Sequence, residues 1–136
     1  MAKTLSQANI VIVDDDYNSS YVTTTYLKQQ GVHQVYTFYN AEEVIDFVHK
    51  TVDHIDLFLV DIHLPGQSGH DLLKVLRNIS KIAEARIVAL TGGVLFMDIQ
   101  KARTSGFDSF LGKPIKTKDF PHQLTQILAG EAVWDW

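Results

Sequence analysis

Short hydrophobic segments alternate along the chain with longer segments in which apolar residues recur at helical spacing. The short segments are apolar at nearly every position and rich in β-branched side chains, which is typical of buried strands. They cover residues 9–14, 34–38, 55–61, 86–91 and 107–112. The longer segments are predicted helices and cover residues 17–30, 40–50, 72–79, 95–104 and 117–129. We therefore expect five strands and five helices in strict alternation.

Residues that commonly start and stop helices support these boundaries. Asn40 with Glu43 three positions later forms a capping-box pattern at the start of the second helix. Gly31 follows the first helix in the position where glycine ends many helices. Thr117 is our predicted cap for the last helix, with Pro121 near its first turn. The first helix follows three aspartates, of which Asp16 is the predicted N-cap.

This alternation predicts an α/β fold with a parallel sheet, because each pair of strands must be joined by a helical crossover. Strands that are apolar on both faces are expected when helices cover both sides of the sheet. In an open sheet of this kind, ligands bind beyond the carboxyl ends of the strands. The residues that follow each strand are therefore the candidates for function.

Polar side chains stand at these strand ends. The first strand runs into Asp14 and Asp15, and the third ends in Asp61. The fourth ends in Thr91, and Lys113 follows the fifth. Three carboxylates in one crevice repel each other unless a cation neutralises them. Because oxygen ligands select a hard cation, the pattern favours Mg²⁺, with Mn²⁺ as the alternative.

Composition narrows the class of protein. The chain has 136 residues, 46% of them hydrophobic, which suits one domain with a full core. The net charge is −4 and the basic residues are scattered, so we expect no nucleic-acid partner. No apolar run reaches the length of a membrane span, and the N-terminus has no signal-peptide core. Together with the absence of cysteine, these features favour a cytoplasmic protein without membrane insertion.

Four sequence motifs together resemble the receiver domain of two-component response regulators, in the single-domain form found in chemotaxis. They are "VDDD" at 13–16, "LVDIHLPGQSG" at 59–69, "ALTGG" at 89–93 and "FLGKPI" at 110–115. Their order and separations match the family over about residues 8–129, which leaves 130–136 as a C-terminal tail. The resemblance implies one receiver domain over 1–136. It also implies a flavodoxin-like, doubly wound five-stranded sheet in the order 2-1-3-4-5 with five helices.

The resemblance also implies a role for each residue at the metal site. Asp61 corresponds to the phosphoryl acceptor, a carboxylate nucleophile that forms an acyl phosphate. Asp15 corresponds to a direct Mg²⁺ ligand, and Asp14 to one that binds largely through water. The backbone carbonyl of His63 corresponds to the third protein contact of the metal. The His63 side chain would border the phosphoryl group, or lie in solvent without a role.

Further roles follow from the resemblance on the neighbouring strands. Lys113 corresponds to the partner of Asp61 and later of the phosphoryl oxygen, and Lys113–Pro114 to a cis peptide. Thr91 corresponds to a switch residue that bonds the phosphoryl group. Phe110 occupies the aromatic switch position, although a phenylalanine there is equally consistent with plain core packing.

Two surfaces stay open to more than one interpretation. Phe96 and Met97 lie off the apolar stripe of their predicted helix and suit either a partner surface or chance exposure. The tail with Trp134 and Trp136 suits folding back on the last helix, docking a partner, or disorder.

The predicted function is Mg²⁺-dependent acceptance of a phosphoryl group from a histidine kinase or a histidine phosphotransfer protein. The modified form would then bind a different protein partner, and we expect no output domain within the chain. Beyond accepting and slowly losing its own phosphoryl group, we expect no enzymatic activity. The alternatives are a receiver module from a hybrid kinase, a phosphorylation-independent pseudo-receiver, and a phosphatase of the haloacid-dehalogenase type. The last normally carries a second acid where this chain has His63.

Overall fold

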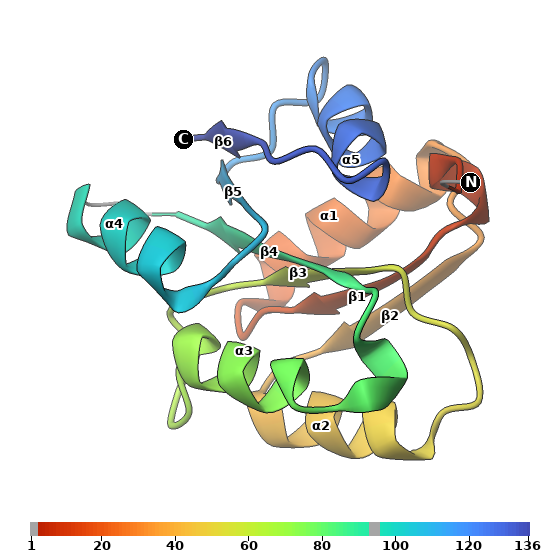
Figure 1. Cartoon of the computed structure of the whole chain (residues 1–136). Helices are drawn as coiled ribbons and strands as arrows, with labels where there is room; N and C mark the ends of the chain where they lie inside the picture. Colours follow the sequence, from red (N-terminus) through yellow and green to blue (C-terminus); the bar gives the residue numbers. More distant parts are fainter. Residues whose placement is uncertain (1–2, 93–95) are drawn as a thin grey trace.

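A parallel sheet of six strands forms the centre of the computed structural model, which describes residues 3–92 and 96–136 (Figure 1). The strand order is β2-β1-β3-β4-β5-β6, and every neighbouring pair is parallel. The strands are β1 (Asn9–Val13), β2 (Gln34–Phe38), β3 (Leu57–Val60), β4 (Arg86–Thr91), β5 (Ser109–Gly112) and β6 (Trp134–Asp135). The predicted order of the first five strands is confirmed. The sixth is a two-residue addition from the C-terminal tail.

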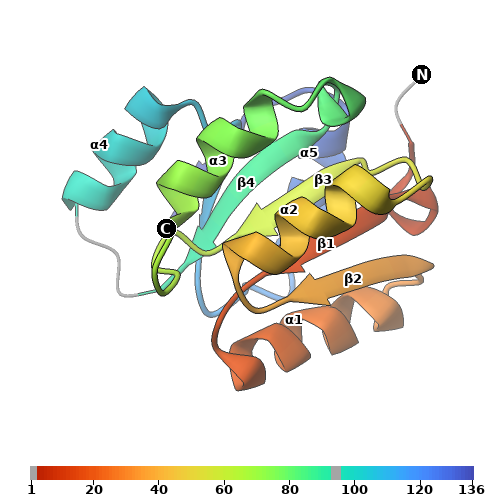
Figure 2. The same cartoon turned by 90° about the horizontal axis from the view of Figure 1, so that it is seen from below.

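Helices cover both faces of this sheet, as the continuous apolar strands predicted (Figures 1 and 2). They are α1 (Tyr17–Gln29), α2 (Ala41–Lys50), α3 (Gly69–Arg77), α4 (Phe96–Ser105) and α5 (Phe120–Leu128). Two short 3-10 turns, η1 (Leu5–Gln7) and η2 (Ser80–Ile82), complete the described elements. Leu95, where the fourth predicted helix begins, lies outside the described residues.

The core divides into two layers because successive strand residues point to opposite faces. Val11 and Val13 join the cluster under α2, α3 and α4, whereas Ile10 and Ile12 join the cluster under α1 and α5. Both sets are fully or almost fully buried. A sheet that is apolar on both faces must bury both of them, so the helices are held on both sides by the same strands.

The helix starts follow the capping pattern with one correction. Asp16 caps α1 by accepting from the backbone of the next residues, and Asn40 caps α2, as predicted. The prediction that Thr117 caps the last helix is wrong, because Asp119 occupies the N-cap position of α5. Residues 116–119 form a turn in which Asp119 and Phe120 both donate to the Lys116 carbonyl. The helix therefore begins after this turn rather than at it.

Among residues 3–92 and 96–136, no helix combines the length and hydrophobicity needed to span a bilayer. The functional candidates lie at the carboxyl ends of the strands, where the loops that follow β1, β3, β4 and β5 meet.

Candidate phosphoryl and metal site

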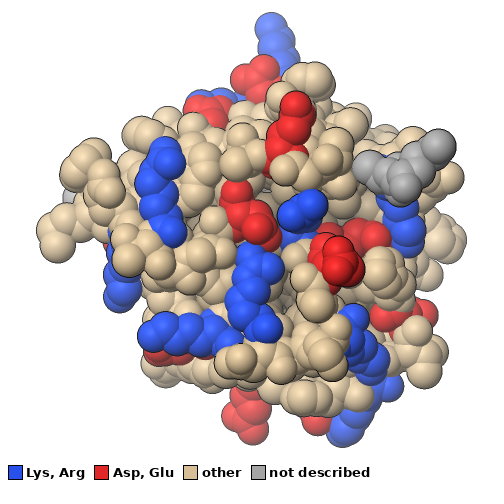
Figure 3. Space-filling view, viewed as in Figure 1, with Lys and Arg blue, Asp and Glu red and all other residues tan. Residues whose placement is uncertain are grey.

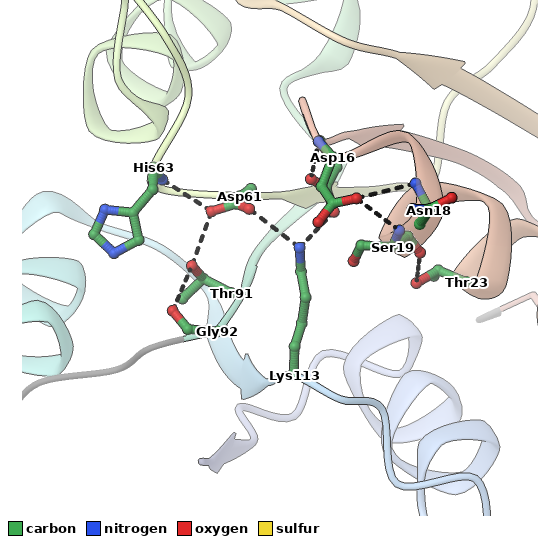
Figure 4. Close-up of polar contacts among 10 residues, drawn as sticks. Asp16, Asn18, Ser19, Thr23, Asp61, His63, Thr91, Gly92 and Lys113 are labelled. Carbon is green, nitrogen blue, oxygen red and sulfur yellow. Dashed lines mark hydrogen bonds and ion pairs between the residues drawn. The ribbon is translucent and has the colours of Figure 1, made fainter.

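The polar residues that end four neighbouring strands meet in one crevice (Figure 4). Asp14 follows β1, Asp61 follows β3, Thr91 is the last residue of β4, and Lys113 follows β5. The parallel register aligns the strand ends, since Val13 pairs with Val60 and Thr91 pairs with Gly112. The sheet topology alone therefore brings together residues that are far apart in the sequence.

Lys113 links two of the carboxylates. Its ammonium donates to Asp14 and to Asp61 Oδ2, the latter at 3.1 Å. Burial of the ammonium acts to lower the pKa of Lys113. However, the hydrogen bond to Asp14 and the charges of Asp61 and Asp14 outweigh it and raise the pKa above its ordinary value. Lys113 therefore stays charged and neutralises part of the acidic cluster.

Asp61 is buried, and the structure provides hydrogen-bond donors to both of its carboxylate oxygens. Oδ1 accepts from the Thr91 hydroxyl at 2.8 Å and from the backbone N–H of His63 at 2.9 Å, while Oδ2 accepts from Lys113. Only 8% of the Asp61 surface is exposed, and Thr91 is fully buried. A carboxylate held by three donors has a fixed orientation.

The three acidic residues of the cluster are close enough to share one cation. One carboxylate oxygen from each of Asp14, Asp15 and Asp61 lies within 4.8 Å of the others. Asp14 is buried and held by the backbone N–H of Asp16 at 2.9 Å, whereas Asp15 is exposed. An all-oxygen donor set with one solvent-exposed member suits Mg²⁺, which keeps several water ligands. Asp16 points into α1 as its cap and is outside this cluster.

The remaining predicted residues surround the crevice. The peptide bond between Lys113 and Pro114 is cis. The His63 ring is exposed and lies with Nε2 3.9 Å from the Asp98 carboxylate on α4. Phe110 is fully buried in β5 and pairs with Ala89 of β4. It belongs to the core layer beneath α2, α3 and α4.

Gly69 is a site-forming residue that the strand-end argument did not single out. It is the first residue of α3 and donates its N–H to the Ile62 carbonyl at 3.1 Å. A Cβ atom built on Gly69 would lie 2.5 Å from the Asp61 carbonyl oxygen and 2.6 Å from Ile62 Cα. The backbone of α3 therefore packs directly against the loop that carries Asp61. The only signal in the sequence was the glycine itself, at the end of "LVDIHLPGQSG".

Comparison with known sequences decides the family. The sequence model described as "Response regulator receiver domain" matches residues 10–125. The chain belongs to the response regulator receiver family. The chain spans only part of the length of two curated relatives. The chain is 28% identical over 120 residues to the heme response regulator HssR of Staphylococcus epidermidis. The aligned region covers 88% of the chain and 51% of HssR.

Two further similarities show the range of the family. The chain is 30% identical over 107 residues to the sensory/regulatory protein RpfC of Xanthomonas campestris pv. campestris, covering 77% of the chain and 14% of RpfC. The structure of the chemotaxis response regulator CheY4 of Vibrio cholerae superposes with a TM-score of 0.78 at 21% identity. That match covers 89% of the chain and 98% of CheY4 and shows the shared fold.

Family membership gives general properties to this receiver. Receiver domains are signalling modules that act with histidine kinases or phosphotransfer proteins, and they bind Mg²⁺ at an acidic site. The Asp14, Asp15 and Asp61 cluster is an acidic site of this kind. The residues present thus fit the cation that the family uses.

Proposed function

We propose that this receiver accepts a phosphoryl group on Asp61 in an Mg²⁺-dependent reaction and that the modified form switches protein partners. The observation that carries the proposal is the position of Asp61, whose oxygens contact Thr91, Lys113 and the His63 amide within one acidic crevice. The Thr91 hydroxyl and the Lys113 ammonium are on rotatable side chains, so they could also donate to a phosphoryl oxygen on Asp61. A carboxylate that only started a turn would need no such set of partners.

In the proposed reaction, a carboxylate oxygen of Asp61 attacks the phosphorus of a phosphohistidine in line with the N–P bond. The O–P bond forms as the N–P bond breaks, and the departing imidazole keeps the electron pair and takes up a proton. Catalysis in such a transfer is mainly positioning and charge stabilisation. Lys113 and the Thr91 hydroxyl supply donors to the phosphoryl oxygens, and the fixed Asp61 carboxylate supplies the nucleophile.

The same crevice would hold the cation through the carboxylates of Asp14, Asp15 and Asp61, with the His63 backbone carbonyl as a further ligand. When bound there, Mg²⁺ supplies positive charge that screens the incoming phosphoryl oxygens. We propose a direct bond from Asp15, which is exposed, and contact largely through water from Asp14, which is already held by Lys113.

The proposed biological setting is a two-component phosphorelay with a sensor histidine kinase or a histidine phosphotransfer protein as donor. The receiver then acts through protein contacts, either on its own or as a module of a larger kinase. The similarity to a part that makes up 14% of RpfC, named a sensory/regulatory protein, is consistent with a receiver inside a larger protein.

The test is to incubate the protein with Mg²⁺ and acetyl phosphate and to measure its intact mass. We expect a gain of one phosphoryl group that EDTA abolishes and that Asp61→Asn prevents. The matched control is Asp16→Asn, which changes the acid that caps α1 and should leave the adduct intact.

The outcomes separate the competing functions. Absence of the adduct in the wild-type protein overturns the proposal and favours a pseudo-receiver. Persistence of the adduct in Asp61→Asn also overturns it, because the phosphoryl group then lies on another residue. Release of phosphate over many turnovers from varied phosphoesters also contradicts it, because that result belongs to a phosphatase.

A further inference from the structure

The C-terminal arm, defined here as residues 133–136, adds a short strand to the edge of β5. Within it, β6 pairs Trp134 with Phe110 and Asp135 with Leu111. The Phe110 N–H donates to the Val133 carbonyl at 2.9 Å, and the Val133 N–H donates to the Ser109 hydroxyl, also at 2.9 Å. The sheet edge that β5 would otherwise present is therefore occupied by the chain itself.

Side chains of the arm add further contacts around β5. The Trp134 ring stacks on Phe110 with centroids 6.1 Å apart and planes inclined by 13°. The Arg103 guanidinium of α4 lies over the Trp134 ring, 4.2 Å from the ring centroid. Trp134 thus joins α4 to β5 and covers the buried aromatic residue at the switch position.

Asp135, the residue after Trp134 in the arm, is held by two side-chain hydrogen bonds. Its carboxylate accepts from Lys116 at 2.6 Å and from Gln123 of α5 at 2.8 Å. These hydrogen bonds lower the pKa of Asp135 below its ordinary value, and the bond from Lys116 has the larger effect. The arm is therefore tied to α5 as well as to α4 and β5.

The strand that carries the arm is also the strand that reaches the phosphoryl site. On its inner edge β5 pairs with β4, so that Gly112 lies opposite Thr91 and the Lys113 N–H donates to the Thr91 carbonyl at 2.8 Å. On its outer edge, Gly112 lies against Trp136. A Cβ built on Gly112 would be 3.0 Å from Trp136 Cα and 3.3 Å from its carbonyl carbon. One glycine thus separates the arm from two residues that contact Asp61.

The arm is held by few backbone bonds, which makes it an element that can open locally. Its strand is two residues long, and its last residue, Trp136, is 56% exposed. Elements with few buried contacts open at low free-energy cost compared with the core strands. The arm is therefore a candidate for local opening when its contacts with β5 change.

We propose that the C-terminal arm is a latch that rests on the edge of β5 before phosphorylation and leaves it when Asp61 is modified. The proposal rests on the proposed function of Asp61. Phosphorylation redirects the Thr91 hydroxyl and the Lys113 ammonium from the carboxylate to phosphoryl oxygens. Both residues flank Gly112, where an added Cβ would lie only 3.0 Å from Trp136 Cα. Release of the arm uncovers the edge of β5 and the outer face of Phe110 for a partner.

The chain carries its own probe of this latch, because its two tryptophans are Trp134 and Trp136. In Trp136→Phe, the fluorescence arises from Trp134 alone. Protein would be treated with Mg²⁺ and acetyl phosphate, and intact mass and acrylamide quenching of the fluorescence measured on the same sample. We expect the quenching constant of Trp134 to rise at least about twofold, in proportion to the phosphorylated fraction, as the ring leaves its contacts with Phe110 and Arg103. The control is the same protein with Asp61→Asn, in which quenching should not change.

The two readouts distinguish the failures. A phosphoryl adduct with unchanged Trp134 quenching overturns the latch and leaves the phosphoacceptor function intact. Absence of the adduct overturns both proposals. Quenching that rises equally in Asp61→Asn also contradicts the latch, because the change then does not come from the modified aspartate.

Linkage provides a second test that needs no tryptophan signal. If phosphorylation releases the arm, weakening the arm must favour the phosphoryl-bound form by the same free energy. Beryllium trifluoride, which mimics a phosphoryl group on a carboxylate, should bind Trp134→Ala with Mg²⁺ at least about fivefold more tightly than wild type. The matched control is Phe96→Ala, which removes an exposed aromatic from the start of α4. Equal affinity in wild type and Trp134→Ala, with both folded by circular dichroism, overturns the proposal.

Discussion

At the scale of single residues, the site was largely predictable because it follows from the ends of parallel strands. Asp14, Asp61, Thr91 and Lys113 each follow or end an apolar run, and the sheet brings them together. Gly69 was not predictable, because its requirement comes from the approach of α3 to the Asp61 backbone. Local sequence shows a glycine but not what a side chain there would meet.

Substitution of Gly69 by alanine should destabilise the protein and disturb the site. The new Cβ would meet backbone atoms of Asp61 and Ile62, which cannot move aside as a flexible side chain does. We expect a loss of about 2–3 kcal/mol in the free energy of unfolding, measured by urea titration. The matched control is Gly92→Ala, whose Cβ would lie at an ordinary 3.6 Å from the Lys113 Cβ. Equal stability of the two variants would contradict the steric argument.

At the scale of elements, the predicted ends of the first five strands lie within two residues of the observed ends. The starts of some helices and the strand in the tail were not predicted as well. The predicted helix over 72–79 began too late, because its first turn in α3 contains the polar residues His70 and Asp71 after the Ser68 cap. The tail could not be assigned, since a two-residue strand has too few positions to show a period. Its docking depends on Phe110 and Arg103, which are distant in the sequence.

The contact between α3 and α4 should depend on pH. His70 Nδ1 lies 3.1 Å from the Ser105 hydroxyl, and the ring meets Phe107 edge-on. Burial, followed by the charge of Lys101, lowers the pKa of His70 below 6.5, and Asp98 and Asp71 only partly oppose this. As the pH falls below 6.5, the unfolded chain therefore binds a proton before the folded protein does, and the free energy of unfolding decreases.

The measurement is urea unfolding at pH 7.5 and 5.5 for wild type and His70→Asn. We expect wild type to lose more stability between these pH values than the variant does, because the other five histidines are common to both. An equal loss in both proteins would mean that His70 keeps the same pKa on folding.

At the scale of the whole molecule, charge is balanced rather than segregated. Figure 3 shows basic and acidic side chains interspersed over one face, in keeping with a net charge of only −4. The fold concentrates negative charge in the carboxylate cluster at the carboxyl ends of the strands, where Lys113 supplies one positive charge. Three carboxylates and one ammonium leave an excess of negative charge, which a divalent cation can neutralise.

Mg²⁺ should therefore stabilise the folded protein as a whole. A ligand that binds only the folded state raises the free energy of unfolding by about 2.7 kcal/mol when its concentration is 100 times its dissociation constant. The thermal midpoint of unfolding should therefore rise with Mg²⁺ and fall again with EDTA. Asp15→Asn should lose most of this rise while keeping its stability in EDTA, because Asp15 is exposed. A Mg²⁺ shift of wild-type size in Asp15→Asn would place the cation elsewhere.

The bond between Lys113 and Asp14 joins positions 99 residues apart, so the chain segment that carries Asp14 is made well before the one that carries Lys113. The crevice cannot exist on a growing chain until β5 has left the ribosome and taken its place beside β4. Until then Asp61 is a carboxylate without its ammonium partner. A kinase that transfers only to the assembled crevice would thus distinguish finished molecules from nascent or misfolded ones, and the signal would pass through folded protein alone.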